Sequence, residues 1–199
     1  MYRLVKPTIE YEDRANRFVE SFYLCASDLY GSNSLDIYVK NRLYDSWVEN
    51  VDFEMNKDIK KGEVPTETYF LIDENDEING ITNIRFNLDE DMDIESASLG
   101  YSIDPTMQGK GLGKIILYLT LLRLKELNID TAYLEVEEDN ERSIDVISSL
   151  GGEFIAKEYN IEYLGDINKY KINVNESLIS NKEKYELLLT RNTKNNKAI

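Results

Sequence analysis

The sequence predicts one mixed α/β (α+β) domain. Strand-like apolar runs occur on both sides of segments with helical periodicity, and the order β, α, α, β, β, β, α, β, α, β, β is typical of a mixed sheet flanked by helices. The 199 residues contain no internal repeat and no linker rich in Pro, Gly or Ser. We therefore expect one domain over residues 1–178 and a C-terminal tail over residues 179–199 that is partly helical or disordered.

The first half of the chain predicts a strand, two helical regions and three further strands. Residues 2–6 indicate a short strand, and Thr8 offers an N-cap to a helix that ends near Ser27. Apolar residues at a four-residue rhythm indicate a second helical region over residues 37–61. The strand-like runs that follow are residues 68–73, 78–88 and 97–103.

The second half begins with the segment 111–127, which is apolar on nearly every side and is expected to be a buried helix. Residues 131–137 alternate apolar and acidic side chains, as in a half-buried strand. A helix over residues 140–150 is closed by a glycine pair. The last two expected strands are residues 153–163 and 168–174, and the tail is expected to hold one amphipathic turn around residues 185–189.

Composition excludes several classes of function. The net charge of -15 argues against nucleic-acid binding, which needs a Lys/Arg surface to displace counterions. The N-terminus has no apolar run of signal length, and no stretch approaches membrane-spanning length, so we expect a cytoplasmic protein with no membrane partner. An acidic surface also attracts cationic ligands such as amines, although excess acid often serves only solubility.

The chain has no histidine and one cysteine, which limits its chemistry. Catalysis by Ser-His-Asp or Cys-His is excluded, and no metal site is expected. Cys25 lies among apolar residues of an expected helix, where we expect a buried thiol. Any general base must therefore be a carboxylate or water.

A glycine-rich segment, residues 108–113, lies between an expected strand and an expected helix, and we call it the phosphate loop. A loop that opens a helix presents unpaired backbone N–H groups at the positive end of the helix dipole, where phosphate binds. Glycines at 109, 111 and 113 let an anion approach the backbone, and Lys110 and Lys114 add positive charge. The spacing matches neither a P-loop nor a Rossmann fingerprint, and a plain structural turn is the competing interpretation.

Residues 101–113 resemble the acetyl-CoA signature of the GCN5-related N-acetyltransferase (GNAT) superfamily, Gln/Arg-x-x-Gly-x-Gly/Ala, with Gln108, Gly111 and Gly113 at its fixed positions. Residues 140–143 and 150–152 resemble a later motif of that superfamily, in which Asn begins a helix and a glycine pair ends it. Residues 84–85 and 100–105 also resemble a bacterial subgroup of predicted acetyltransferases.

This resemblance implies a mostly antiparallel mixed sheet of about seven strands, with the fourth and fifth strands splayed apart. The pantetheine arm of acetyl-CoA, the co-substrate, would lie beside residues 99–103. Acetyl would pass directly to an amine without a covalent enzyme intermediate. The residues expected to bind acetyl-CoA are Ile103, Gln108, Gly109, Lys110, Gly111, Leu112, Gly113, Lys114, Asn140 and Ser143.

Direct attack requires an uncharged amine, so a carboxylate must accept its proton. The candidates are Glu95, Glu135 and Glu137, with Glu95 preferred, although each could be a solvated surface acid. Ile147 occupies the position where many superfamily members have a tyrosine that protonates the departing thiolate. Tyr101, or else Tyr118, could replace that tyrosine.

The sequence therefore predicts an acetyl-CoA-dependent N-acetyltransferase acting on an amine of a small molecule or peptide, with a homodimer as one possible assembly. The intact phosphate loop beside the missing tyrosine leaves a second hypothesis, a non-catalytic acyl-CoA-binding module. A structural protein that has lost CoA binding is a third.

Overall fold

A computed structural model describes residues 1–88, 94–161 and 164–190, and the side chains of residues 94, 95 and 186–190 lie outside the described part. The fold is a seven-stranded sheet in the order β1-β2-β3-β4-β5-β7-β6. Neighbouring strands are antiparallel except β4 and β5, which are parallel. The strands are β1 Arg3–Val5, β2 Thr66–Ile72, β3 Ile78–Leu88, β4 Ile94–Ile103, β5 Thr131–Glu137, β6 Glu153–Asn160 and β7 Gly165–Asn173. This arrangement confirms the expected mixed, mostly antiparallel sheet.

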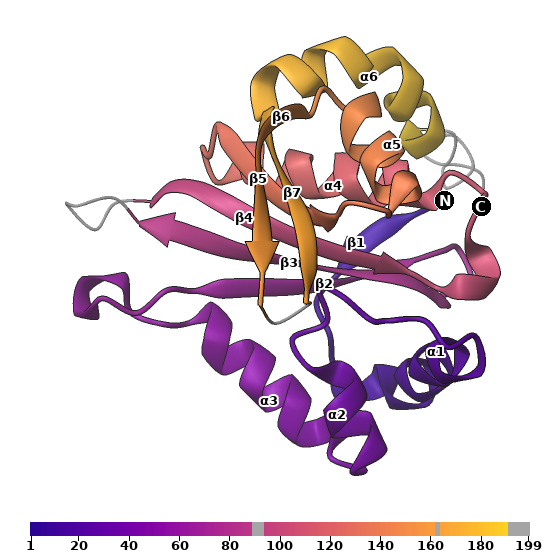
Figure 1. Ribbon diagram of the computed structural model, residues 1–199. Helices are drawn as coiled ribbons and strands as arrows, with labels where there is room; N and C mark the ends of the chain where they lie inside the picture. The colour runs from indigo at the N-terminus through magenta and orange to yellow at the C-terminus, as the bar shows by residue number, and fades with distance from the viewer. Residues whose placement is uncertain (89–93, 162–163, 191–199) are drawn as a thin grey trace, which may run out of the picture.

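Helices cover both faces of the sheet (Figure 1). The first three helices lie on one face and the last three on the other. Their bounds are α1 Glu12–Leu24, α2 Leu35–Lys40, α3 Tyr44–Met55, α4 Leu112–Glu126, α5 Glu141–Ser149 and α6 Val174–Thr190. Short 3₁₀ turns occur at Ile9–Tyr11, Ile59–Lys61 and Pro105–Met107.

Each helical layer has its own apolar core. On the α4 side, Leu121 and Leu124 of α4 pack with Leu134 and Ile172 of the sheet, and all four are almost fully buried. On the α1 side, Trp47 of α3 stacks on Phe70 of β2, with 5.6 Å between ring centroids, and Phe18 belongs to the same cluster. Burying one such side chain contributes about 1.5–3 kcal/mol, so both layers are held firmly on the sheet.

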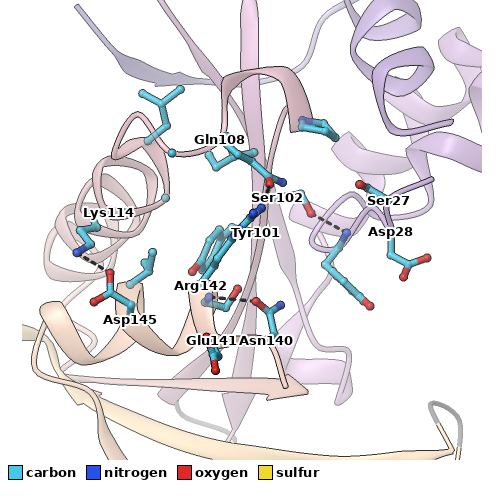
Figure 2. Close-up of a pocket in the computed structure, with 18 of the residues that line it drawn as sticks. Ser27, Asp28, Tyr101, Ser102, Gln108, Lys114, Asn140, Glu141, Arg142 and Asp145 are labelled. Carbon is cyan, nitrogen blue, oxygen red and sulfur yellow. Dashed lines mark hydrogen bonds and ion pairs between the residues drawn. The ribbon is translucent and has the colours of Figure 1, made fainter. Parts of the chain in front are cut away.

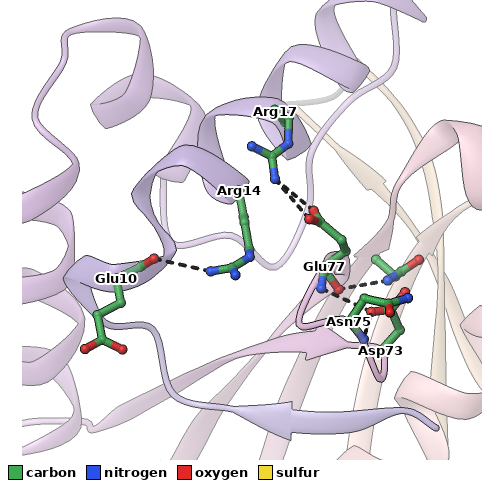
Figure 3. A network of polar contacts seen from close by, with 7 residues as sticks. Glu10, Arg14, Arg17, Asp73, Asn75 and Glu77 are labelled. Atoms are coloured by element: carbon green, nitrogen blue, oxygen red, sulfur yellow. Dashed lines mark hydrogen bonds and ion pairs between the residues drawn. The ribbon is translucent and has the colours of Figure 1, made fainter.

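Polar contacts fix α1 to the β2–β3 turn (Figure 3). The Asp73 carboxylate accepts hydrogen bonds from the backbone N–H groups of Asn75 and Glu77, which shapes the turn. Glu77 in turn accepts two hydrogen bonds from the guanidinium of Arg17 on α1, at 3.0 and 3.1 Å. These contacts therefore link the middle of α1 to the β2–β3 turn.

The strands β4 and β5 pair only over the first part of their shared length. The paired residues are Ala97 with Ala132, Ser98 with Tyr133, and Leu99 with Leu134. Beyond these pairs β4 continues to Ile103 and β5 continues to Glu137, but the two strands no longer pair with each other. The splay expected between the fourth and fifth strands is therefore present.

Three local expectations differ from the structure. The helical region expected over residues 37–61 is two helices, α2 and α3, because Arg42 adopts a left-handed φ of 58° between them. The Thr8 side chain makes no capping hydrogen bond. Cys25 is exposed rather than buried, because α1 ends at Leu24 and Cys25 is its C-cap.

The C-terminal segment forms a longer helix than the single turn expected around residues 185–189. α6 begins at Val174 and packs against α4, where the rings of Tyr185 and Tyr118 stack with centroids 4.6 Å apart. Val174, Leu178 and Tyr185 are buried in the α4-side core. The helix is therefore part of the folded domain. Among the described residues, no helix combines the length and apolar character needed to cross a membrane.

Candidate active site

A cavity of about 1080 Å³ opens beside the β4–β5 splay (Figure 2). Its walls come from the α1–α2 loop, the end of β4, the phosphate loop, the end of β5 and the first turns of α5. The expected acetyl-CoA residues that line it are Ile103, Gln108, Gly109, Gly111, Leu112, Gly113, Lys114, Asn140 and Ser143. The structure thus brings nine of the ten expected residues to one cavity. Lys110 lies outside the lining, with its ammonium 3.1 Å from the Met107 sulfur.

The backbone conformation of the phosphate loop requires glycine at two positions. Gly109 and Gly111 have φ angles of 76° and 81°, which L side chains rarely adopt. A Cβ atom at either position would meet no atom within 4 Å, so the space above the loop is open. Gly111 is the N-cap of α4, whose first backbone N–H groups face outward there. This geometry fits a pyrophosphate bound at a helix N-terminus.

Helix α5 supports the loop from the other side of the cavity. A Cβ atom on Gly113 would approach Val146 Cγ2 to 3.0 Å, so glycine lets α4 and α5 pack closely. The Lys114 ammonium lies 2.7 Å from an Asp145 carboxylate oxygen, and the Arg142 guanidinium donates to Gln108 Oε1 at 2.5 Å. Lys114 is therefore neutralised in part by its neighbour, and Arg142 adds a positive charge that the sequence motif did not suggest.

The side chain of Tyr101 lies in the wall of the cavity, under the start of α4 (Figure 2). Its hydroxyl lies beside Ser143 but makes no hydrogen bond of normal geometry with a described residue. Burial raises the pKa of Tyr101 to about 12, so the hydroxyl stays protonated at neutral pH. Tyr118, the other tyrosine considered, is buried against Tyr185 in the α4–α6 interface. Ile147 also lies in the core, with 1% of its surface exposed.

The three candidate carboxylates occupy different places. Glu137, at the end of β5, lines the cavity and accepts a 2.8 Å hydrogen bond from the Tyr30 hydroxyl. Glu135 is exposed, lies 3.3 Å from the Lys169 ammonium, and is not among the lining residues. The backbone of Glu95 lies at the start of β4, eight residues from Ile103, or roughly 26 Å along the strand. Its side chain lies outside the described part.

The α1–α2 loop closes the cavity on the side opposite α5. The Tyr30 N–H donates to Ser102 Oγ at 2.8 Å, which ties the loop to β4. At Gly31 the loop meets β4 so closely that a Cβ atom there would clash with the backbone of Gly100. Sequence reasoning missed these residues, because their partners are far away along the chain and no motif marks them.

The family model described as Acetyltransferase (GNAT) family matches residues 36–151, more than half of the chain. The chain belongs to the GNAT acetyltransferase family. No curated protein matches the sequence. Many solved structures match the structure of this chain.

Three of these structures illustrate the range of GNAT enzymes that the chain resembles. Mycobacterium smegmatis RimJ in complex with CoA-disulfide has 13% identity and a TM-score of 0.68, over 89% of this chain and 87% of that one. RimL, a ribosomal L7/L12 α-N-protein acetyltransferase in complex with coenzyme A, has 18% identity and a TM-score of 0.67, over 86% and 93%. A chimera of the Vibrio cholerae spermidine N-acetyltransferase SpeG has 13% identity and a TM-score of 0.63, over 89% and 98%. At these identities the likeness concerns the GNAT fold.

Proposed function

We propose that the protein transfers acetyl from acetyl-CoA to an amine of a small molecule or peptide in the cytoplasm, by direct attack of the amine on the thioester. The observation that carries this proposal is one cavity shared by the phosphate loop and the β4–β5 splay. The family membership supports it, as do the CoA complexes of RimJ and RimL, which share the fold.

The described residues fit acetyl-CoA. The backbone N–H groups of the phosphate loop would bind the pyrophosphate, with Arg142 and Lys114 adding positive charge nearby. Residues 100–103 pair with β3 but have no ladder partner on the β5 side, and their backbone groups on that side would hold the pantetheine arm in the splay. Asn140 and Ser143 line the same cavity from α5.

Glu137 is the carboxylate that we propose as the general base. Of the described carboxylates considered from the sequence, it is the one that lines the cavity, and the bond from Tyr30 fixes its position. A carboxylate at this place could accept the amine proton directly or through one water. Glu95 and Glu135 remain the alternatives.

Tyr101 is the group that we propose for protonating the departing thiolate. Tyr101 lines the cavity, and its hydroxyl is protonated at neutral pH, is buried beside Ser143, and makes no hydrogen bond of normal geometry with a described residue. Because a thiolate is a good leaving group, this proton transfer adds to the rate without being indispensable.

The second candidate function is a non-catalytic acyl-CoA-binding module. The position of Ile147 favours it, because that side chain lies in the core and offers no proton donor to the cavity. The two functions differ in turnover but share the binding of acetyl-CoA.

A pair of measurements tests the proposal. Saturating acetyl-CoA is expected to raise the melting temperature, since a ligand that binds only the folded state stabilises it by mass action. Release of free CoA thiol is then followed with a panel of amines. Turnover of any amine excludes the binding module, and tight binding without turnover favours it. Absence of a thermal shift would refute both functions.

A further inference from the structure

One residue of the α1–α2 loop, Tyr30, makes contacts on both sides of the β4–β5 splay. Its backbone N–H donates to Ser102 Oγ on β4 at 2.8 Å, and its hydroxyl donates to Glu137 Oε1 on β5, also at 2.8 Å. Both distances are those of well-formed hydrogen bonds. Tyr30 therefore joins the ends of two strands that do not pair with each other at this place.

The two contacts lie at the same level of the sheet. The last pair of the parallel β4–β5 ladder is Leu99 with Leu134, and Ser102 and Glu137 each follow three residues later. Successive side chains of a strand point to opposite faces, and Leu99 and Leu134 are buried in the α4-side core. Ser102 and Glu137 therefore point to the face that carries α1–α3. Tyr30 comes from that layer and spans the splay from this face.

The backbone around Tyr30 is anchored to β4. Ser102, which accepts the N–H bond, is 7% exposed. The next residue of the loop, Gly31, packs so closely on β4 that a Cβ atom there would lie 2.4 Å from the carbonyl carbon and oxygen of Gly100. The loop is therefore held on β4 at two neighbouring residues, and the Tyr30 side chain extends from this anchor to β5.

The contact divides the two oxygens of the Glu137 carboxylate. Oε1 accepts the hydrogen bond from Tyr30, whereas Oε2 accepts none from the described residues, and Glu137 makes no ion pair within that part of the chain. A carboxylate that is oriented through one oxygen and unengaged at the other can accept a proton from an amine, directly or through one water.

We propose that Tyr30 is a positioning residue for acetyl transfer. At the level of Ser102 and Glu137 no ladder sets the distance between β4, whose backbone would hold the pantetheine arm, and the proposed base on β5. Tyr30 sets this distance through its two hydrogen bonds, and so places Glu137 Oε2 relative to the thioester. This inference rests on the proposed function and adds a residue of the α1–α2 loop that acts through Glu137.

A double-mutant cycle on the acetylation rate tests this role. Tyr30→Phe removes the hydroxyl but keeps the ring and the backbone bond to Ser102. It is expected to lower kcat about tenfold, with KM for the amine and the thermal shift by acetyl-CoA close to wild-type values. Glu137→Gln is expected to lower kcat about 100-fold or more. On top of Glu137→Gln, Tyr30→Phe is expected to add at most about a twofold loss, because the base that it positions is already removed.

Tyr23→Phe is the matched control. The Tyr23 hydroxyl also ties this region together, since it donates to the Asp36 carbonyl oxygen at 3.2 Å, but Tyr23 does not line the cavity. Its kcat is expected to stay within about twofold of the wild type. A normal thermal shift by acetyl-CoA in each variant shows that the rates are those of folded protein.

The outcomes separate this inference from the proposed function. Similar slowing by Tyr30→Phe with and without Glu137→Gln, an unchanged kcat in Tyr30→Phe or in Glu137→Gln, or equal slowing in Tyr23→Phe overturns the positioning role. Amine turnover by the wild type keeps the proposed function in place in each of these cases. Absence of turnover of any amine by the wild type refutes the proposed function and this inference together.

Discussion

Gly111 and Gly151 adopt nearly the same backbone conformation, with φ angles of 81° and 82°. At both positions a Cβ atom would meet no neighbour within 4 Å. They differ in what lies above them: Gly111 belongs to the wall of the large cavity, whereas Gly151 follows the end of α5. The pair separates the effect of backbone strain from the effect of a lost anion site.

Replacing either glycine with alanine is expected to cost about 1–2 kcal/mol of unfolding free energy, because an L residue is strained at this φ. Only Gly111→Ala is expected to lose the stabilisation by acetyl-CoA, since its methyl group enters the space of the pyrophosphate. Thermal melts of both variants with and without acetyl-CoA measure the two effects. If acetyl-CoA raised the melting temperature of the two variants equally, the phosphate loop would not be part of the acetyl-CoA site.

The Tyr101 hydroxyl provides a second residue-scale prediction. Tyr101→Phe is expected to leave acetyl-CoA binding in place and the unfolding free energy within about 1 kcal/mol of the wild type, because the hydroxyl makes no hydrogen bond that would be lost. Acetylation is expected to slow by roughly tenfold or more. Because the pKa of Tyr101 is raised to about 12, the hydroxyl remains a donor between pH 7 and 10, and the ratio of the two rates should stay constant over that range. An unchanged acetylation rate in this variant would show that Tyr101 contributes only to packing.

At this scale the sequence predicts residues that are close together along the chain. Gln108, Gly111 and Gly113 form a spaced motif, and their positions in the cavity follow from it. Tyr30 could not be assigned, because its hydroxyl reaches a carboxylate 107 positions away and the contact depends on how the α1–α2 loop crosses β4. Arg142 was missed for a similar reason, since its partner lies 34 positions earlier.

Between elements, one ion pair joins β2 to α4. The Arg123 guanidinium donates to both carboxylate oxygens of Glu67, at 2.8 and 2.9 Å, and Glu67 also accepts from the Tyr69 hydroxyl at 2.7 Å. Burial acts to raise the pKa of Glu67, but the hydrogen bonds from Arg123 and Tyr69 outweigh it and the pKa is lowered. The side chain of Glu67 is 8% exposed and that of Arg123 is 30% exposed. The pair therefore links the helix that carries the phosphate loop to the sheet.

A lowered pKa in the folded state makes stability depend on pH. The ionised form of Glu67 stabilises the fold fully above the pKa of the unfolded state, and this contribution is lost as pH falls through the lower folded pKa. Glu67→Gln is expected to cost about 1.5–3 kcal/mol at pH 7, near the lower end because Arg123 is partly exposed, and progressively less in acid. Urea denaturation at pH 7 and below pH 4 measures both values. A cost independent of pH would show that Glu67 acts through packing alone.

Elements with a strong local sequence pattern were predicted well. Helices separated by a break that no Gly or Pro marks in the sequence were not. The apolar periodicity of residues 111–127 corresponds to α4. The rhythm of residues 37–61 continues across the break between α2 and α3, because neither Gly nor Pro marks the left-handed Arg42. The start of β4 also extends before residue 97, into a segment that looks acidic and loop-like in sequence.

At the scale of the whole molecule, α6 packs against α4 in the α4-side core. Tyr185→Ala is expected to cost about 3–5 kcal/mol, because it removes a buried aromatic ring that stacks on Tyr118. Ile179→Ala on the same helix is the control and is expected to change stability by at most about 0.5 kcal/mol, since Ile179 is 73% exposed. Chemical denaturation of both variants makes the comparison. Similar values for the two would place α6 outside the cooperative domain.

The overall architecture was predictable because one spaced motif fixes the positions of β4, the phosphate loop and α4 together. The second layer, α1–α3, could not be placed by a motif, and its place over the sheet depends on long-range apolar packing such as that of Trp47 of α3 on Phe70 of β2. The loop between α1 and α2 of that layer lines the active-site cavity. The acceptor therefore has to be inferred from tertiary structure.

Gly31 approaches Gly100 so closely that the residue tolerated at one position depends on the other. This constrains chimeras in which the α1–α2 loop or β4 is exchanged with that of another family member. A loop transplanted onto this scaffold must carry a residue without a Cβ atom at the crossing point, because a Cβ at position 31 would clash with the β4 backbone. A Cβ at position 100 would in turn approach Asn83 Oδ1 on β3 to 2.9 Å. Loop grafts intended to change acceptor preference should therefore be made as a unit of three segments, the loop, β4 and β3.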